Sequence, residues 1–198
     1  MKMLSLDQGF KLISLARKAI ESQFSGQELD FEEEKKEFSK NQGVFVTLNK
    51  FPSRELRGCI GFPYPIKSLA LAVVEAAKSA AFSDTRFMPL EKGELDNIII
   101  EISVLTVPEQ IKAKGQDILE KIEIGKDGLI VQTHHFSGLL LPQVSLEQKW
   151  NVLEFLRATC IKAGLPTEIW LNPECRIYKF QAQIFFEKEP KGKVEEKS

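Results

Sequence analysis

The spacing of apolar residues along the chain alternates between the period of a helix and that of a strand. Over residues 5–26 the apolar side chains recur every three or four positions, which predicts an amphipathic helix with one buried face. Ser5 and Gln8 form a capping-box pattern at its start, and Gly26 is placed to end it. The stripe expected to face the core consists of Leu6, Phe10, Ile13, Ala16, Ile20 and Phe24.

Two further segments have the composition and end signals of helices. Residues 66–82 are rich in alanine and leucine and stop before the sequence SDTRF. Residues 145–166 repeat the capping-box pattern with Ser145 and Gln148, and Gly164 followed by proline ends them. We expect a helix over each segment.

Strands are predicted where β-branched and aromatic residues gather between turn signals. Residues 43–50 and 56–63 are predicted to be two neighbouring strands, and the almost unbroken apolar run 97–107 a buried central strand. Strands are also expected around 128–144, and one long final strand over 176–187. Because helices and strands do not alternate regularly, the pattern predicts an α+β fold in which a mainly antiparallel sheet packs with helices.

Composition restricts the class of protein and its partners. A chain of 198 residues with 43% apolar residues suits one domain or two small lobes. A net charge of −1 disfavours general binding of nucleic acid. Three widely separated cysteines favour neither a zinc site nor a disulfide framework, so a reducing, cytoplasmic location is expected. No apolar run is long enough to cross a membrane, and the charged residues 187–198 are expected to be disordered.

The sequence RELRGCIGFP, residues 54–63, contains the first candidate reactive group. In a plain strand Arg57 and Cys59 face the same side, where the guanidinium could lower the pKa of the thiol. Gly58 and Gly61 permit close backbone approach, and their amides could bind an anion. The alternative is that Cys59 is a packed small residue and the glycines form a bulge. The residue types leave both interpretations open.

Five other polar residues are candidates, each with a plain structural alternative. Asp84 and Arg86 could orient a substrate or polarise a thiol, or form only a local ion pair. Glu101 interrupts an apolar strand, so it needs a partner or a cleft unless it faces solvent. One of His134 and His135 could act as a general base for Cys59, or both could lie exposed in a hairpin. Two adjacent histidines do not readily ligate one ion, so no metal site is expected.

The chain resembles the AMMECR domain family over residues 1–186. The residues that carry the resemblance are LRGCIG at 56–61 together with GVFVTL, DTRFMPL, EISVL, IGKDGLIV, SGLLLPQV and TCIKAGLP, which precedes a tryptophan. Met88 departs from the family pattern, in which proline is usual at this position. The resemblance implies an α+β fold with a larger lobe that contains both termini, a smaller lobe, and a cleft between them near LRGCIG.

The resemblance implies no particular reaction, because the activity of the family is not established. Prokaryotic members often occur with Memo-like and radical SAM proteins, which implies a shared pathway with these partners. One hypothesis is a cysteine-dependent enzyme that acts on a small anionic substrate at the cleft between the lobes. The alternative is a non-catalytic binding or adaptor module for a partner protein or, less favoured, nucleic acid. Neither hypothesis specifies a cofactor or an oligomeric state. The enzyme hypothesis assigns catalysis to Cys59, Arg57, Asp84 and Glu101, and substrate binding to Gly58, Gly61, Arg86 and His135.

Overall fold

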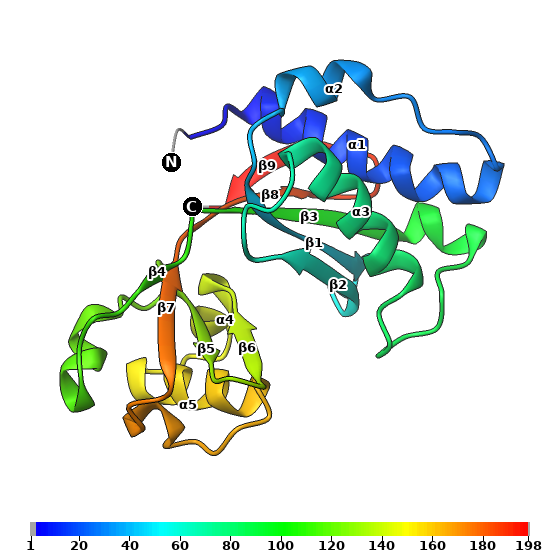
Figure 1. The fold of residues 1–198 in the computed structure, drawn as a ribbon. Coiled ribbons are helices and arrows are strands. Elements are labelled where there is room, and N and C mark those ends of the chain that lie inside the picture. Colours follow the sequence, from blue (N-terminus) through cyan, green and yellow to red (C-terminus); the bar gives the residue numbers. More distant parts are fainter. Residues whose placement is uncertain (1–2, 198) are drawn as a thin grey trace. The chain divides into compact units, whose positions relative to one another are not determined.

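The computed structural model describes residues 3–197, which divide into two compact units. Unit 1 contains the chain up to Leu105 and from Gln183 onward, and unit 2 contains Thr106–Ala182. Each unit has its own sheet, its own helices and its own hydrophobic core (Figure 1). The predicted α+β class with antiparallel sheets is confirmed.

The sheet of unit 1 has five strands in the order β2-β1-β3-β8-β9. Strand β1 lies between its two neighbours and pairs antiparallel with both β2 and β3. The apolar residues Val44, Val46 and Leu48 of β1 are fully buried and alternate with partly exposed ones, as expected for a strand with one face on a core. The strands span Gly43–Lys50 (β1), Leu56–Phe62 (β2), Ile98–Leu105 (β3), Ala182–Glu187 (β8) and Val194–Lys197 (β9).

Helices α1 (Leu6–Ser25) and α3 (Leu69–Phe82) pack against each other and against this sheet, and the short α2 (Glu32–Glu37) lies beside them (Figure 1). The capping box of Ser5 and the left-handed Gly26 are present as predicted. The predicted stripe is wrong at its start, where Leu6 and Phe10 are 47% and 53% exposed. In this turn the residue that faces the core is Gly9. A Cβ atom on Gly9 would overlap the ring of Phe185, which packs against the helix at this point.

Unit 2 has a four-stranded sheet in the order β4-β7-β5-β6, with a core around Phe155, Leu156 and Trp170. The helix predicted from Ser145 begins later, because Asn151 and Glu154 form the capping box of α5. The elements of this unit are β4 (Glu109–Gln110), β5 (Gly128–Gln132), β6 (Ser137–Leu140), α4 (Pro142–Glu147), α5 (Val152–Lys162) and β7 (Arg176–Phe180). Short 3-10 helices span Lys92–Asn97 in unit 1 and Gly115–Lys121 and Ile169–Leu171 in unit 2.

The last strand predicted from the sequence, over 176–187, is two strands in two different sheets. The backbone N–H of Gln181 donates to the hydroxyl of Thr106, and its carbonyl accepts from the N–H of Thr106. These bonds take Gln181 out of both ladders, so β7 ends before it and β8 begins after it. The alternation of apolar residues continues through this break, which is why the sequence pattern did not reveal it.

The C-terminal residues 187–198 differ from the expectation of disorder. Residues Val194–Lys197 form β9, which pairs antiparallel with β8. Val194 is 5% exposed and belongs to the core of unit 1. A single buried apolar residue and one strand ladder therefore order a segment whose composition is otherwise charged.

Candidate functional site: the Cys59 cluster

The two glycines of the LRGCIG segment are required by close packing in unit 1. A Cβ atom on Gly58 would lie 2.1 Å from the backbone oxygen of Ala80 in α3. A Cβ atom on Gly61 would lie 2.3 Å from the backbone oxygen of Val44 in β1. Helix α3 and strand β1 therefore approach β2 so closely that only glycine fits at these positions. Binding of an anion by the backbone amides of Gly58 and Gly61 remains a hypothesis.

Arg57 lies at an irregularity in the pairing of β2 with β1. Leu48 faces Gly58 and Asn49 faces Leu56, so Arg57 has no register partner and is the extra residue of a bulge. Its Nε and Nη2 atoms donate to the carboxylate of Glu94 at 2.7 and 2.9 Å. This bidentate pair raises the pKa of Arg57 and lowers the pKa of Glu94. The guanidinium is therefore held by Glu94, a residue for which the sequence offered no signal.

Cys59 forms a hydrogen bond through each of its polar atoms. Its backbone N–H donates to Oδ2 of Asp84 at 2.9 Å, and its carbonyl accepts from Nη2 of Arg86 at 3.2 Å. Its Sγ accepts from the hydroxyl of Thr47 at 3.3 Å. We call Cys59, Thr47, Asp84, Arg86 and Glu101 the Cys59 cluster. Asp84 and Arg86 come from the segment after α3, so they attach that segment to β2.

The Asp84–Arg86 pair is the strongest interaction in the Cys59 cluster. Asp84 accepts hydrogen bonds from the backbone N–H of Arg86 at 3.2 Å, from its Nε at 2.9 Å and from its Nη2 at 2.6 Å. The Asp84 side chain is 4% exposed and that of Arg86 is 44% exposed. The guanidinium of Arg86, and after it the backbone N–H of Cys59, hold the pKa of the Asp84 carboxyl well below its usual range. The same contact raises the pKa of Arg86.

The thiol of Cys59 has a raised pKa, and the main cause is burial. The hydroxyl of Thr47 and the charge of Arg86 act in the opposite direction, while the carboxylates of Glu101 and Asp84 raise the pKa further. The thiol is therefore neutral near pH 7. The cation near the sulfur is Arg86 rather than Arg57, which the sequence had suggested.

Glu101 belongs to this cluster through the register of the sheet. Thr47 of β1 lies opposite Cys59 of β2 on one side and opposite Glu101 of β3 on the other. A thiol, a hydroxyl and a carboxylate therefore form one row across three strands. The partner expected for Glu101 is Lys197 of β9, whose Nζ lies 3.9 Å from Oε2 of Glu101.

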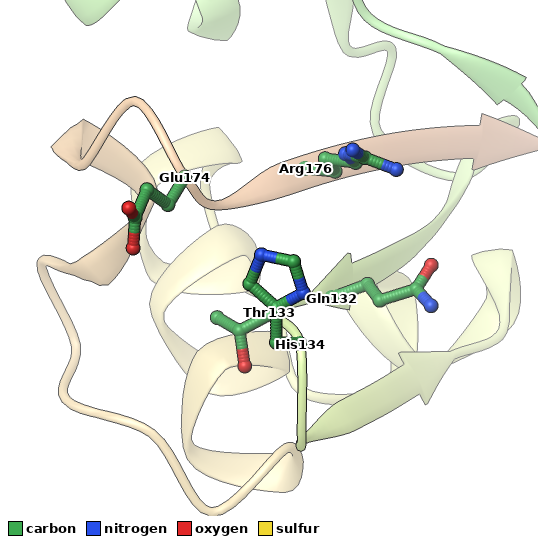
Figure 2. Close-up of a pocket in the computed structure, with 5 residues that line it drawn as sticks. All are labelled: Gln132, Thr133, His134, Glu174 and Arg176. Carbon is green, nitrogen blue, oxygen red and sulfur yellow. The ribbon is translucent and has the colours of Figure 1, made fainter.

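His134 and His135 lie in unit 2, in the turn that joins β5 and β6. Both side chains are exposed there, and neither is part of the Cys59 cluster of unit 1. His134 lines a surface pocket together with residues of β5 and β7 (Figure 2). His135, which the enzyme hypothesis assigned to substrate binding, does not line that pocket.

Residues 3–197 contain no group of three or more His, Cys, Asp and Glu side chains placed to hold a metal ion. Within the same range, no helix has both the length and the apolar composition needed to cross a membrane.

The fold and the Cys59 cluster define an α+β protein with two antiparallel sheets. In one of its strands the backbone of a cysteine is hydrogen-bonded to an aspartate–arginine pair. The AMMECR1 family model matches residues 13–185, and the chain belongs to this family. A protein of Methanopyrus kandleri is 49% identical over 197 residues, which cover 98% of this chain and 95% of that protein. A protein of Methanocaldococcus jannaschii is 47% identical over 198 residues, which cover 100% and 98%. The crystal structure of an uncharacterised Pyrococcus horikoshii protein matches with a TM-score of 0.92 at 45% identity, covering 96% of this chain and 97% of that one.

Proposed function

We propose that this AMMECR1-family chain is a non-catalytic binding or adaptor protein. The observation that carries the proposal is the state of Cys59, whose N–H, carbonyl and sulfur are all hydrogen-bonded within the chain while partial burial raises the pKa of the thiol. A nucleophilic cysteine needs an accessible thiolate. The same contacts suit a structural role, in which Cys59 fixes the segment that follows α3.

The segment fixed in this way ends in a residue suited to binding a partner protein. Met88 is 81% exposed, and it follows the half-buried Phe87 and the anchored Arg86. Methionine is common at protein-binding surfaces because its side chain is flexible and polarizable. The family resemblance suggests a Memo-like or a radical SAM protein as the partner. We propose that the Arg86–Met88 segment contacts that partner.

A binding assay with purified Memo-like and radical SAM proteins encoded in the same genome tests this surface. Met88→Lys should weaken binding at least about tenfold, because it places a charge in an apolar contact. Met3→Lys is the matched control, since Met3 is 61% exposed elsewhere in unit 1. Equal effects of the two substitutions, or no binding of either partner, would contradict the proposed surface.

A cysteine-dependent enzyme is the second candidate, and the row of Cys59, Thr47 and Glu101 favours it. In this candidate the thiol proton passes to the Thr47 oxygen while the Thr47 hydroxyl proton passes to Glu101. The half-exposed Arg86 binds a small anionic substrate, and Asp84 positions Arg86. Arg57 would act only indirectly, because Glu94 holds its guanidinium. The roles of Gly58 and Gly61 in substrate binding remain part of this candidate alone.

Alkylation of Cys59 by iodoacetamide, followed by mass spectrometry as a function of pH, separates the two candidates. The adaptor proposal expects slow labelling at pH 7 and an apparent pKa above the ordinary value of about 8.5. Glu101→Gln should then speed labelling, because the Glu101 carboxylate raises the pKa of the thiol. If Glu101 is the proton acceptor of an enzyme, the same substitution should slow labelling. Cys160 is the internal control, because burial raises its pKa to about 11.

A further inference from the structure

We propose that unit 2 contains a binding site for a small zwitterion, a molecule that carries both a carboxylate and an ammonium group. The site is a surface pocket of about 140 Å³ between the end of β5, the turn that follows it and the start of β7 (Figure 2). It is lined by Gln132, Thr133, His134, Glu174 and Arg176. The inference is independent of the role of Cys59, which belongs to unit 1.

Local hydrogen bonds fix both rims of the pocket. On the hairpin side, the N–H of Thr133 donates to the carbonyl of Phe136 at 2.8 Å, and the N–H of Phe136 donates to Oγ1 of Thr133 at 3.3 Å. On the other side, the N–H of Glu174 donates to Oδ1 of Asn172 at 2.9 Å, and the N–H of Cys175 donates to the carbonyl of Asn172 at 3.0 Å. The polar side chains are thus presented from a backbone that is held by its own hydrogen bonds.

The sheet register brings the two strands of the site together. Gln132 of β5 lies opposite Arg176 of β7, so the amide and the guanidinium start from neighbouring positions. Figure 2 shows the imidazole of His134 at the centre of the group, with Glu174 and Arg176 pointing away from each other. The pocket therefore combines groups of opposite charge that do not neutralise each other by direct contact.

Glu174 and Arg176 differ from several charged residues of unit 2 that form ion pairs. Arg157 Nε lies 2.6 Å from Glu168, and Lys179 Nζ lies 3.1 Å from Asp127. Neither Glu174 nor Arg176 forms a side-chain hydrogen bond or an ion pair with any residue in the described range 3–197. Both side chains are exposed and line the pocket, so each is free to turn inward toward a ligand that carries both charges.

The chemistry of each lining group matches one part of such a ligand. A guanidinium binds a carboxylate through two parallel hydrogen bonds, and the Gln132 amide can add a third donor. The Glu174 carboxylate accepts from an ammonium group. A simple anion would meet repulsion from Glu174, and a simple cation would meet repulsion from Arg176. The small volume, far below the roughly 300–1,000 Å³ of pockets for drug-sized ligands, favours a molecule the size of a free amino acid.

An NMR titration of the full chain with glycine, acetate and methylammonium at constant ionic strength tests the proposal. Glycine should shift the backbone amides of residues 132–134 and 174–176 in a saturable way, with a Kd on the order of millimolar for so small a ligand. Acetate and methylammonium should each bind at least about tenfold more weakly, because each lacks one charged hydrogen-bonding group.

Substitutions at the two charged positions locate the site. Arg176→Gln and Glu174→Gln should each reduce glycine affinity at least about tenfold, since each removes a charged hydrogen bond. Both side chains are exposed, so the amide spectrum should remain that of the folded chain. Arg157→Gln is a matched control on α5. His135→Ala is a matched control for His134→Ala, because only His134 lines the pocket.

Three outcomes would overturn the inference. Acetate binding as tightly as glycine, with Glu174→Gln without effect, would make the pocket an anion site only. No saturable shift up to about 50 mM glycine would show that it binds no zwitterion of this size. Equal losses in Arg176→Gln and Arg157→Gln would place the binding elsewhere.

Discussion

Replacing Asp84 by asparagine should destabilise unit 1 substantially while leaving its shape almost unchanged. The Asp84 carboxylate accepts from two backbone N–H groups, those of Cys59 and Arg86, and from the Arg86 guanidinium. In Asp84→Asn one oxygen becomes an amide nitrogen, which cannot accept a hydrogen bond. A donor group then faces donors at a site where the original side chain is only 4% exposed.

The magnitude follows from the bonds that are lost. Each hydrogen bond to a charged group contributes about 1.5–3 kcal/mol, and the half-exposed Arg86 adds at most about 1 kcal/mol as an ion-pair partner. Losing one backbone bond and weakening the ion pair should lower the free energy of unfolding by about 3 kcal/mol. For a chain of this length that corresponds to a fall in Tm of roughly 6–12 °C.

Urea unfolding followed by far-UV circular dichroism measures this loss. Tryptophan fluorescence does not report unit 1 directly, because Trp150 and Trp170 both lie in unit 2. Asp96→Asn is the control, since Asp96 is an exposed aspartate of unit 1 that pairs with Lys191, and its unfolding curve should match that of the parent. A loss below about 1 kcal/mol in Asp84→Asn would refute the reasoning.

The pH dependence of the stability difference provides a second test of the same reasoning. The pKa of Asp84 is lower in the folded chain than in the unfolded chain, so the unfolded state binds the proton more tightly. The contribution of Asp84 is complete above its unfolded pKa of about 3.9 and is lost as the pH falls below that value. The stability difference between the parent and Asp84→Asn should therefore shrink as the pH falls from about 5 to about 2.

Three further predictions concern other parts of unit 1. Gly58→Ala should lower the free energy of unfolding in urea by about 3 kcal/mol or more, because the new Cβ atom would overlap the Ala80 carbonyl. Gly93→Ala is the control and should be tolerated, because a Cβ atom there meets no atom within 4 Å. Thr47→Val should raise the pKa of the Cys59 thiol and slow its alkylation at pH 8, whereas Thr47→Ser keeps the hydroxyl and should not. Equal alkylation rates in the two variants would show that the Thr47 hydroxyl does not act on the sulfur. Val194→Asp should detach β9 and lower the hydrogen-exchange protection of those amides of residues 184–187 that bond to β9; unchanged protection would contradict the assigned role of Val194.

The sequence pattern predicted α1, β1 and β3 of unit 1 because their signals are local. The capping box of Ser5, the alternation over β1 and the apolar run of β3 each lie within one element. The break at Gln181 could not be predicted, because it depends on a hydrogen bond to Thr106, 75 residues away. The start of α5 was misplaced because Ser145 and Gln148 have the same spacing as the true capping pair.

The candidate site was predicted in part for the same reason. Spacing in the sequence brought Asp84 and Arg86 together correctly, since they are two residues apart and bond directly. It paired Arg57 with Cys59 on the assumption of a regular strand, and the bulge opposite Leu48 removes that assumption. Glu94, which binds Arg57, and Thr47, which binds the sulfur, lie on other elements with no distinguishing pattern.

The connection at Thr106 and Gln181 makes unit 2 an insertion between the third and fourth strands of the sheet of unit 1. The two ends of the insertion are joined by hydrogen bonds of 2.8 and 2.9 Å, so a few residues could bridge them. Insertions whose ends lie close together are tolerated and exchanged most readily. During synthesis, however, β8 and β9 follow the whole of the inserted unit. In the nascent protein β3 of unit 1 therefore lacks its second neighbour until β8 has been made.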